Sequence, residues 1–411
     1  MMRAALCIWI LSAVVCLGRS DHHEGHAIGE QDTAVNSNDN SVSLLTSANQ
    51  DFALRLYKKL AAHADSQGKN VFFSPASVSV ALAALSVGAR GETHRQLFGG
   101  LGFNNSQLMQ ANVDQAFHTL LEKSASNEDT NAGTAVFVDN RFKPEPDFLE
   151  VLKQSYFAEG FNVDFTKTKD SANTINTYVS DKTNGKIEKL VENLDPSTVM
   201  YLISYIYFKG KWEIPFDADL TKEDTFNVNE NTKVPVQMMN MEDDFKSYYD
   251  QAINTSVLHL PFNGSYSMLL MLPDDMATLE NSICPAHITK WLKWMKSRKY
   301  DIYVPKFSIK SSYTLNDVLI DMGMTDMFGD RADLSGISAG KKLAVSEVVH
   351  QATLDVDEAG ATAAAATGIG IMLMSFRHIP VLKFNRPFMV AITEDTTNEI
   401  LFMGKIINPN L

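Results

Sequence analysis

Cysteine is scarce in this sequence, with three residues among 411. Cys7 and Cys16 lie in an N-terminal apolar stretch that we expect to be removed, so the mature chain would keep only Cys284. One thiol cannot close an internal disulfide, which excludes a small disulfide-stapled scaffold and leaves packing as the source of stability. For Cys284, capping by a small thiol and pairing with another chain are open, but we favour a partly buried side chain without a role.

Clustered positive charge is missing as well. The chain has 36 Lys and Arg against 49 Asp and Glu, a formal charge of -13, and its basic residues are scattered. DNA and RNA bind to surfaces on which Lys and Arg are gathered, so nucleic acid is excluded as a partner. Because 45% of the residues are hydrophobic, the chain can bury a large core, and disorder throughout is excluded.

The N-terminal apolar run, residues 4–17, is shorter than the ~20 residues that span a bilayer. Arg3 precedes it and small residues follow it, which together are typical of a secretory signal. We therefore predict a signal peptide over residues 1–20, cleaved after Gly18 or Ser20, and a secreted, extracellular protein.

The next segment, residues 21–47, is polar and acidic with scattered His, Asn and Ser, and so predicts a flexible tail. Cleavage after Ser20 would place His23 third from a free amine. That spacing can chelate Cu or Ni, but His-bearing tails are usually only solvated. We expect no bound metal and no cofactor.

Three Asn-X-Ser/Thr sequons begin at Asn104, Asn254 and Asn263. Glycosylation at such sites requires the secretory route, so they agree with an exported chain. Asn104 and Asn263 lie among Gly and Asn residues typical of turns, whereas Asn254 precedes a strand-like run at residues 257–260. All three are glycosylation candidates, with Asn104 and Asn263 favoured.

Helical and strand-like patterns are mixed from residue 48 onward. Apolar residues at helical spacing begin near Asn49, and a nearly uncharged helix begins at Ser74, where Ser can cap it and Pro75 fits its first turn. No internal linker and no regular strand-helix-strand rhythm is present, so we predict one α+β domain over residues 48–411. Further helices are expected at residues 106–122, 146–157 and 171–183, and strands at 134–138, 199–209, 234–239, 265–272, 300–304, 388–392 and 400–406.

Strict alternation predicts one more strand between residues 344 and 357. Small and apolar residues share one face with His350, and the other face is polar, which is typical of a half-buried strand. His350 would therefore point into the core, and we favour a hydrogen-bonded structural histidine over a catalytic one. The inward set is Ala344, Ser346, Val348, His350, Ala352, Leu354 and Val356, and the outward set is Glu347, Gln351, Thr353, Asp355 and Asp357.

Residues 359–376 carry no charge, and residues 359–379 contain no proline. A membrane span fits poorly because Gly, Ala and Thr dominate the first half, and a buried helix fits poorly because glycines interrupt the run. A loop that is able to become a strand inside a sheet fits better, because alternate residues would then place small side chains in the core. These residues are Ala361, Ala363, Ala365 and Thr367, and none of them is an Arg, Lys or Pro that would block insertion.

The segment Asp357-Glu358-Ala359-Gly360, followed by this Ala- and Thr-rich run, resembles the hinge of the serpin family. Other segments resemble the family in the same order along the chain, from about Asn49 to the last residues, and within the family the chain is most similar to alpha-1-antitrypsin-like members. The resemblance implies a serpin fold, in which helices surround three β-sheets and a reactive loop, about residues 358–380 here, is exposed. The other matching segments are Asn70-Val71-Phe72-Phe73-Ser74-Pro75, Thr183-Asn184-Gly185-Lys186-Ile187, Phe208-Lys209-Gly210-Lys211-Trp212, Phe384-Asn385-Arg386-Pro387-Phe388 and Phe402-Met403-Gly404-Lys405.

The resemblance also implies that the partner is a serine protease and that the loop is its bait. Carried over by position from the hinge Glu, the scissile residue is Met374, followed by Ser375. Attack on the Met374 carbonyl would give an acyl-enzyme, which insertion of the loop as a new strand would trap. Met suits an elastase-like or chymotrypsin-like pocket, and Arg377 is the competing bait for trypsin-like enzymes. The implied hinge residues are Glu358, Gly360, Ala361, Thr362, Ala363, Ala364, Ala365, Ala366 and Thr367.

Two further sites follow from the resemblance: a shutter of polar groups beneath the main sheet, and a breach at its top. Ser204 stands where close relatives usually have Asn. Residues 106–122 match the helix through which heparin accelerates some serpins, and because they contain no Lys or Arg, heparin activation is not expected. The implied shutter residues are Asn70, Ser74, Ser77, Ser204 and His350, and the breach residue is Trp212, for which a plain core role is equally open.

Two other functions compete with protease inhibition. Gly336-Ile337-Ser338-Ala339-Gly340 fits the G-x-S-x-G nucleophile elbow of hydrolases, but polar residues precede it where an elbow needs an apolar strand. A noninhibitory serpin, acting as a ligand carrier or chaperone, is the alternative, since the fold can persist without trapping. Its sign would be a bulky or charged hinge, whereas Ala361 is small and uncharged. We therefore expect a monomeric inhibitor of serine proteases that is not an enzyme and has no membrane or nucleic-acid partner.

Overall fold

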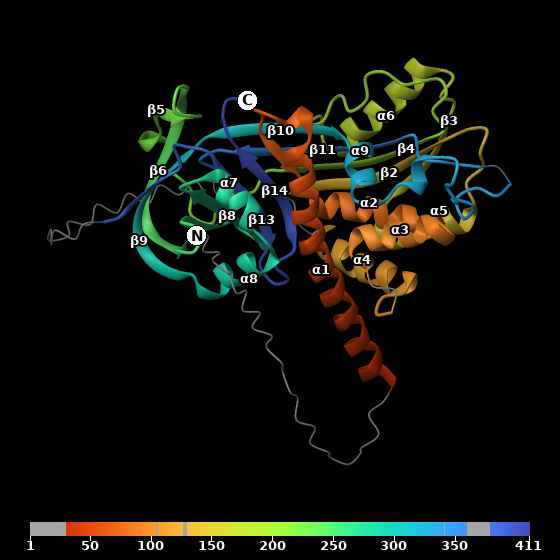
Figure 1. The fold of residues 1–411 in the computed structure, drawn as a ribbon, viewed down its shortest axis with the longest axis horizontal. Coiled ribbons are helices and arrows are strands. Elements are labelled where there is room, and N and C mark those ends of the chain that lie inside the picture. The colour runs from red at the N-terminus through yellow and green to blue at the C-terminus, as the bar shows by residue number, and fades with distance from the viewer. Residues whose placement is uncertain (1–29, 104–105, 126–129, 341, 360–378) are drawn as a thin grey trace, which may run out of the picture. The chain divides into compact units, whose positions relative to one another are not determined.

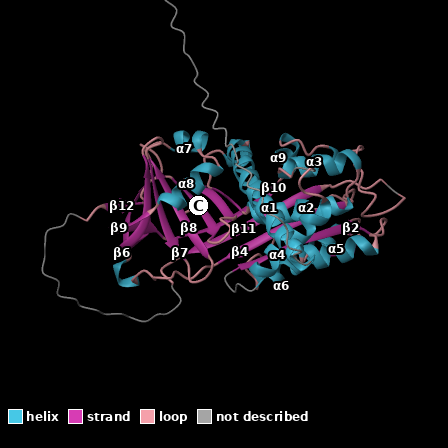
Figure 2. Cartoon of the chain, turned by 90° about the horizontal axis from the view of Figure 1, so that it is seen from below, coloured by secondary structure: helices cyan, strands magenta, loops and turns pink. Residues whose placement is uncertain are grey.

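The strands form two hydrogen-bonded sheets in the part of the chain that the computed structural model describes, residues 30–103, 106–125, 130–340, 342–359 and 379–411, with side chains from residue 39. The strands are β1 (Val71–Phe73), β2 (Thr130–Asp139), β3 (Glu159–Val163), β4 (Met200–Phe208), β5 (Lys222–Asn227), β6 (Lys233–Asp250), β7 (Thr255–Pro261), β8 (Tyr266–Pro273), β9 (Lys296–Pro305), β10 (Phe307–Thr314), β11 (Glu347–Val356), β12 (Val381–Lys383), β13 (Phe388–Glu394) and β14 (Ile400–Ile406). One sheet has the order β10-β11-β4-β2-β3. The other has the order β1-β14-β13-β8-β7-β6-β9-β12, with β5 paired to β6 (Figures 1 and 2).

The helix over residues 75–88 begins as predicted. Ser74 Oγ accepts a hydrogen bond from the Ser77 N–H, and Pro75 occupies the first turn. The α-helices of the described part are α1 (Glu30–Ala62), α2 (Pro75–Gly88), α3 (Gly91–Leu101), α4 (Gln110–Ala125), α5 (Pro146–Tyr156), α6 (Thr168–Lys182), α7 (Met276–Ser282), α8 (Pro285–Trp294) and α9 (Asn316–Asp321). Among them, no helix combines the length and the apolar character that a bilayer crossing requires.

The five-stranded sheet is covered on both faces. In Figure 1, α2, α4 and α5 lie on one side of it and α6 on the other. The residues of β4 divide accordingly, because Leu202 belongs to the same hydrophobic cluster as α2, whereas Ile203 and Tyr205 belong to the cluster of α6 residues Ile175 and Val179. A continuous apolar run with both faces buried is what a central strand requires.

β11 is buried more deeply than its alternation predicted. Gln351 and Thr353, expected on a solvated face, are only 1% and 7% exposed, so the prediction of a half-buried strand is wrong. The cause is that β11 lies between β10 and β4, and its second face is also covered, with Val349 in the α6 cluster. His350 points to the α2 side and is fully buried, as predicted.

The expected division into three sheets is not seen in the hydrogen bonding of the described strands, because β6 connects two of them. Residues 238–247 of β6 pair with β9, and residues 246–250 pair with β7. A strand of 18 residues is long enough to serve these two neighbours in succession. The predicted α+β class is confirmed.

α1 corrects part of the predicted tail. A flexible segment was expected over residues 21–47, but the helix begins at Glu30, and Leu45 is fully buried in the main hydrophobic cluster. Residues 38–411 form one compact unit, so the packed part starts earlier than predicted. Residues 1–29, which include the predicted signal peptide, lie outside the described residues.

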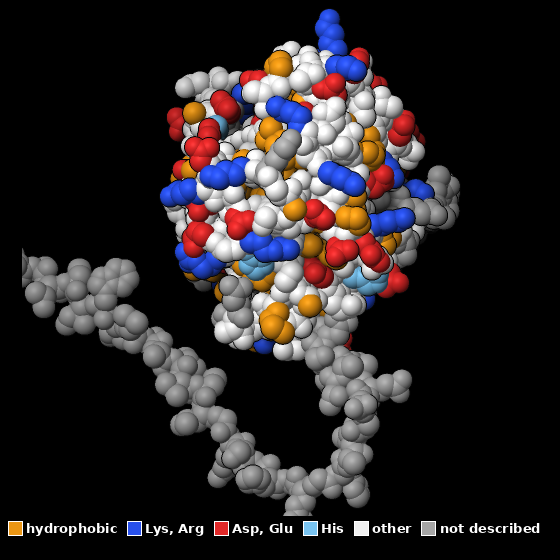
Figure 3. All heavy atoms as spheres, turned by 90° about the vertical axis from the view of Figure 1, so that its right-hand side faces the viewer, with side chains coloured by type: hydrophobic (Ala, Val, Ile, Leu, Met, Phe, Trp, Pro, Cys, Tyr) orange, Lys and Arg blue, Asp and Glu red, His pale blue; other side chains and the backbone are white. Residues whose placement is uncertain are grey.

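Charged side chains of both signs are intermixed on the face of the molecule seen in Figure 3. Lys and Arg alternate there with Asp and Glu, and no single-sign patch forms on that face. This arrangement agrees with the scattered basic residues of the sequence.

Candidate functional site

The boundary between β4 and β11 in the five-stranded sheet, called the seam below, is the place where a loop could enter. The two strands pair in parallel, with Ser204 opposite His350, whereas β11 pairs antiparallel with β10 on its other edge. β11 ends at Val356, two residues before the uncharged segment that begins at Ala359. The residues that control the seam should therefore lie beneath it and at the end of β11.

Three serines and one imidazole form a buried cluster beneath the seam. Ser204 Oγ on β4 lies 3.1 Å from His350 Nδ1 on β11 and 2.7 Å from Ser77 Oγ on α2. The backbone N–H of Ser74 donates to His350 Nε2 over 2.9 Å. The structure thus brings together four of the five residues predicted as the shutter, and it includes Ser204 even though this position departs from the usual Asn.

The hydrogen-bond directions fix the state of His350. Because the backbone N–H of Ser74 can only donate, Nε2 must be the unprotonated acceptor, and Nδ1 carries the proton that is donated to Ser204 Oγ. The Ser204 hydroxyl can then donate to Ser77 Oγ. Burial lowers the pKa of His350 to about 3, so the imidazole is neutral at neutral pH, and its burial fits a structural histidine.

Asn70, the fifth predicted shutter residue, does not take part in this cluster. Its Nδ2 donates to the Asn408 carbonyl over 2.8 Å, and its Oδ1 accepts from the N–H groups of Ile407 and Asn408. Asn70 precedes β1, which pairs with β14, so its side chain meets the chain segment that follows β14. Its assignment to the shutter is therefore corrected: Asn70 fixes the C-terminal segment.

Trp212 holds the chain just beyond the end of β11. Its indole stacks on Phe262 with 4.4 Å between ring centroids, and Nε1–H donates to the Asp357 carbonyl over 2.7 Å. The Trp212 backbone N–H donates to the Ala359 carbonyl over 3.1 Å. These bonds give the buried indole its polar partner and place Trp212 at the start of the uncharged segment, where the breach was predicted.

Glu358, the hinge glutamate, is held by two side chains. Lys306 Nζ lies 2.7 Å from its Oε2, and Thr221 Oγ1 donates to its Oε1 over 2.7 Å. Burial opposes ionisation of Glu358, but the hydrogen bonds from Lys306 and Thr221 outweigh it and hold the pKa of this carboxyl below its usual value. Lys306 lies between β9 and β10, and Thr221 precedes β5, so the carboxylate ties the end of β11 both to the start of its neighbour β10 and to the start of β5 in the nine-stranded sheet. Neither partner was predicted.

The remaining hinge and bait residues lie outside the described part of the chain. They are Gly360, Ala361, Thr362, Ala363, Ala364, Ala365, Ala366, Thr367, Met374 and Ser375, together with the competing Arg377. The two anchor points of this segment are described. It leaves β11 in the five-stranded sheet and continues into β12, which pairs in parallel with β9 of the nine-stranded sheet.

The G-x-S-x-G segment does not form a nucleophile elbow. Ser338 is 3% exposed and lies among turns, with neither a strand before Gly336 nor a helix after Gly340. In the described residues no three His, Cys, Asp or Glu side chains are grouped as ligands for a metal ion. The G-x-S-x-G segment therefore lacks the strand and helix on which a nucleophile elbow is built.

Two of the three sequons, at Asn254 and Asn263, lie on the surface of the described unit. Asn263 is exposed, and so is Asn254, which lies in the turn between β6 and β7 with a φ of 44°, so the preference for Asn263 over Asn254 has no support in the fold. Asn104 lies outside the described residues. Cys284 is half-buried, as favoured, with its Sγ 3.1 Å from His287 Nδ1.

Comparison with known proteins gives one consistent result. The chain is 42% identical over 373 residues to a protein of Mus musculus that is named as a serine protease inhibitor, covering 89% of each chain. It is 40% identical over 366 residues to Alpha-1-antitrypsin-like protein GS55-MS of Ictidomys tridecemlineatus, covering 88% of each. Among solved structures, human thyroxine-binding globulin with bound thyroxine superposes with a TM-score of 0.84 at 31% identity, covering 90% of this chain and all of that one.

A second solved structure, human glycosylated kallistatin, superposes with a TM-score of 0.82 at 36% identity and covers 90% of this chain and 99% of its own. The family model described as Serpin (serine protease inhibitor) matches residues 47–409. This match spans both sheets, the seam and the segment that was predicted as the reactive loop. The chain belongs to the serpin family.

Proposed function

We propose that this chain is a secreted suicide inhibitor of elastase-like or chymotrypsin-like serine proteases. A protease would cleave between Met374 and Ser375, and insertion of the freed loop at the seam would trap its acyl-enzyme. The observation that carries the proposal is the parallel pairing of β4 and β11 at the point where the uncharged segment leaves β11. The chain itself is not an enzyme, and the relatives it matches are named as serine protease inhibitors.

The strand directions at the seam suit insertion of this segment. A chain that turns back from the end of β11 runs antiparallel to β11, and because β4 is parallel to β11, it also runs antiparallel to β4. The inserted strand would thus replace one parallel ladder with two antiparallel ladders, the slightly more stable kind of pairing. This gain favours the inserted state once cleavage frees the loop.

The side chains of the segment suit a sheet that is buried on both faces. Ala361, Ala363, Ala365 and Thr367 would face one side and Thr362, Ala364 and Ala366 the other, and none of them is charged. The seam is covered by α2 residues on one face and by the α6 cluster on the other. Small uncharged side chains can enter such a layer, whereas a buried unpaired charge would cost several kcal/mol.

Two sets of bonds hold the seam closed before cleavage. In its middle, Ser204 on β4 is bonded to His350 on β11, and insertion must separate this pair. At its end, Trp212 and Glu358 fix the first residues of the hinge. We infer that these bonds keep the uncleaved protein in its native state and delay insertion until the loop is cut.

We further propose that residues 1–20 are removed on secretion, that one or more of Asn104, Asn254 and Asn263 are glycosylated, and that the protein acts as an extracellular monomer. We also propose that it acts without heparin, because residues 106–122 contain no Lys or Arg. The alternative is a noninhibitory serpin that carries a ligand or acts as a chaperone. It gains some weight from the similarity in fold to thyroxine-binding globulin, which is described in complex with thyroxine.

Incubation with elastase, chymotrypsin and trypsin in separate reactions tests the proposal. We expect a denaturant-resistant complex with elastase or chymotrypsin and release of a C-terminal peptide whose first residue is Ser375. A peptide that begins at His378 would instead assign the bait to Arg377. Complete cleavage without any complex would support the noninhibitory alternative.

A further inference from the structure

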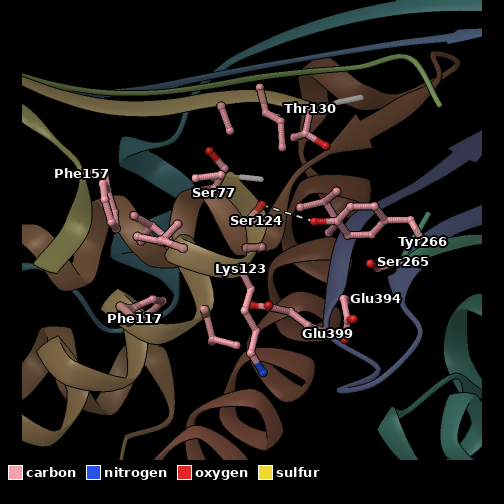
Figure 4. Close-up of a pocket in the computed structure, with 18 of the residues that line it drawn as sticks. Ser77, Phe117, Lys123, Ser124, Thr130, Phe157, Ser265, Tyr266, Glu394 and Glu399 are labelled. Carbon is pink, nitrogen blue, oxygen red and sulfur yellow. Dashed lines mark hydrogen bonds between the residues drawn. The ribbon is translucent and has the colours of Figure 1, made fainter. Parts of the chain in front are cut away.

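A cavity of about 510 Å³ lies beside the five-stranded sheet and reaches Ser77 of the cluster beneath the seam. Its walls come from α2, α4, the end of α5, β2, β4, the start of β8 and the turn between β13 and β14. This volume is in the range of sites that bind small organic molecules. Figure 4 shows Phe117 and Phe157 on one side of the cavity and Glu394 and Glu399, beside Tyr266, on the opposite side.

The apolar side is formed by α4 and the residue that follows α5. Phe117, Leu120 and Leu121 of α4 line it, together with Phe157. Phe157 ends α5 in the left-handed conformation, with a φ of 49°, and its side chain is 49% exposed. An aromatic ring left this exposed at a cavity wall offers a flat contact for an apolar ligand.

The acidic side contains one carboxylate whose hydrogen-bonding capacity is largely unused. Glu394 already accepts three hydrogen bonds within its own turn, from the Thr396 N–H and from the N–H and hydroxyl of Thr397. Glu399 accepts one from Asn49 Nδ2, at 3.2 Å, and forms no ion pair with a described side chain. Burial and the nearby Glu394 carboxylate raise the pKa of Glu399 to about 7. A cationic group beside Glu399 would supply the charge partner that no described side chain provides.

Hydroxyl groups line the cavity between these two sides. Thr130 Oγ1 is buried and has no hydrogen-bond partner among the described residues. Ser124 Oγ and Tyr266 OH lie 3.2 Å from each other, as the dashed line in Figure 4 shows. A buried hydroxyl without a partner costs free energy, and a bound polar group would recover it.

We propose that this cavity binds a small amphiphilic organic cation, with its ammonium group at Glu399 and its apolar body against Phe157 and the α4 side chains. The two carboxylates disfavour an anionic ligand on that side, and a neutral ligand would leave the Glu399 charge unpaired. Lys123 and Lys211 also line the cavity, so an anionic probe belongs in the test. The inference is independent of the proposed inhibitory function.

Binding of three matched probes to the full chain tests the inference: 2-(1-naphthyl)ethylamine, 2-(1-naphthyl)ethanol and 1-naphthylacetate, each measured by equilibrium dialysis at neutral pH. We expect the amine to bind at least about tenfold more tightly than the alcohol, since a charge-assisted hydrogen bond is worth about 1.5–3 kcal/mol. Glu399→Gln should remove this preference, chiefly by weakening binding of the amine. Ala132→Phe, which adds bulk at the cavity wall, should weaken binding of both probes.

Glu230→Gln is the matched control, because Glu230 is exposed and does not line the cavity. It should leave all three affinities unchanged, and thermal unfolding of each variant verifies that it is folded. Tighter binding of 1-naphthylacetate than of the amine would overturn the proposal. The proposal would equally fail if the amine did not bind at millimolar concentration, or if Glu399→Gln retained the preference for the amine.

Discussion

Acidification should destabilise the native protein through His350 before its carboxylates are protonated. Burial lowers the pKa of this imidazole to about 3, whereas in the unfolded chain it titrates near 6.5. Between these values the unfolded state binds more protons, so the free energy of unfolding is fully retained above pH 6.5 and falls as the pH is lowered. At about 1.4 kcal/mol for each pH unit, about 3 kcal/mol would be lost between pH 6.5 and 4.5, and about 5 kcal/mol in all.

Urea unfolding followed by tryptophan fluorescence, at about one-unit steps from pH 7.5 to 4.5, measures this loss in the wild type and in His350→Gln. The glutamine amide can accept from the Ser74 N–H and donate to Ser204, but it does not take up a proton. We expect the variant to be less stable by about 1 kcal/mol at pH 7.5, because its hydrogen bonds fit less well. Its stability should also fall less steeply with pH, so that the two curves cross between about pH 6 and 5.

His259 on β7 provides a second buried histidine for comparison. Burial, and after it the nearby Lys246 charge, lowers its pKa to about 4. His259→Gln should therefore also reduce the pH dependence, and the double variant should be flatter than either single variant. Equal slopes for the wild type and His350→Gln would refute the assignment of acid sensitivity to the cluster beneath the seam.

Three further predictions concern the loop and its anchor. Ala363→Arg would place a charge on the inserting face and should convert the inhibitor into a substrate. Ala364→Arg faces the other way and should retain more trapping. Equal ratios of complex to cleaved protein in the two variants would contradict the proposed inserting face. Glu358→Gln and Lys306→Met should each lower the free energy of unfolding by about 1 kcal/mol. The double variant should lower it by less than the sum of the two single effects, because both variants break the same ion pair. Full additivity would show that the ion pair does not stabilise the fold. Oxidation of Met374 by peroxide should slow the trapping of elastase because the sulfoxide is polar. The Met374→Leu variant should trap elastase equally fast before and after peroxide treatment. Undiminished trapping by the oxidised wild type would contradict the assignment of Met374 as the bait.

Elements with a local pattern were predicted well from the sequence. The last strand, expected at residues 400–406, is β14 (Ile400–Ile406), and the helix that begins after Ser74 is α2. In both, the signal lies within a few residues: alternating or apolar positions together with a cap or turn residue at the boundary. The single α+β unit follows from the same local patterns, because they contain no regular strand-helix-strand rhythm.

Features that depend on distant neighbours were not predicted from local patterns. Gln351 and Thr353 alternate as if one face of β11 were solvated, but the α6 side of the sheet covers them. Nothing in the local sequence links Glu358 with Lys306, because their contact depends on the pairing of β10 with β11, which places Phe307 opposite Val356. The position of Asn70 against the C-terminal segment likewise follows from the pairing of β1 with β14.

The cluster beneath the seam was found through the family resemblance, and its geometry explains why a serine can serve at position 204. The cluster connects its three elements through a group on β4 that accepts from His350 Nδ1 and can donate to α2. A hydroxyl does both, since Ser204 Oγ accepts from the imidazole and can donate to Ser77. The departure from the usual Asn therefore leaves the connection between β4, β11 and α2 intact.

The two sets of bonds that close the seam respond to acid in a definite order. The contribution of His350 to the free energy of unfolding is lost from pH 6.5 downward. The pKa of Glu358 is lowered in the fold, so its contribution is fully present above its unfolded pKa of 4.5 and is lost as the pH falls through its folded pKa. Between about pH 6.5 and 4.5 the middle of the seam is therefore weakened while the end of β11 stays fixed by Lys306. If the loop inserts from that end, as proposed, protein held near pH 5 should be destabilised without converting to the more stable inserted form. After return to neutral pH, an unchanged melting temperature would agree with this order, and a raised one would show that the middle of the seam alone controls insertion.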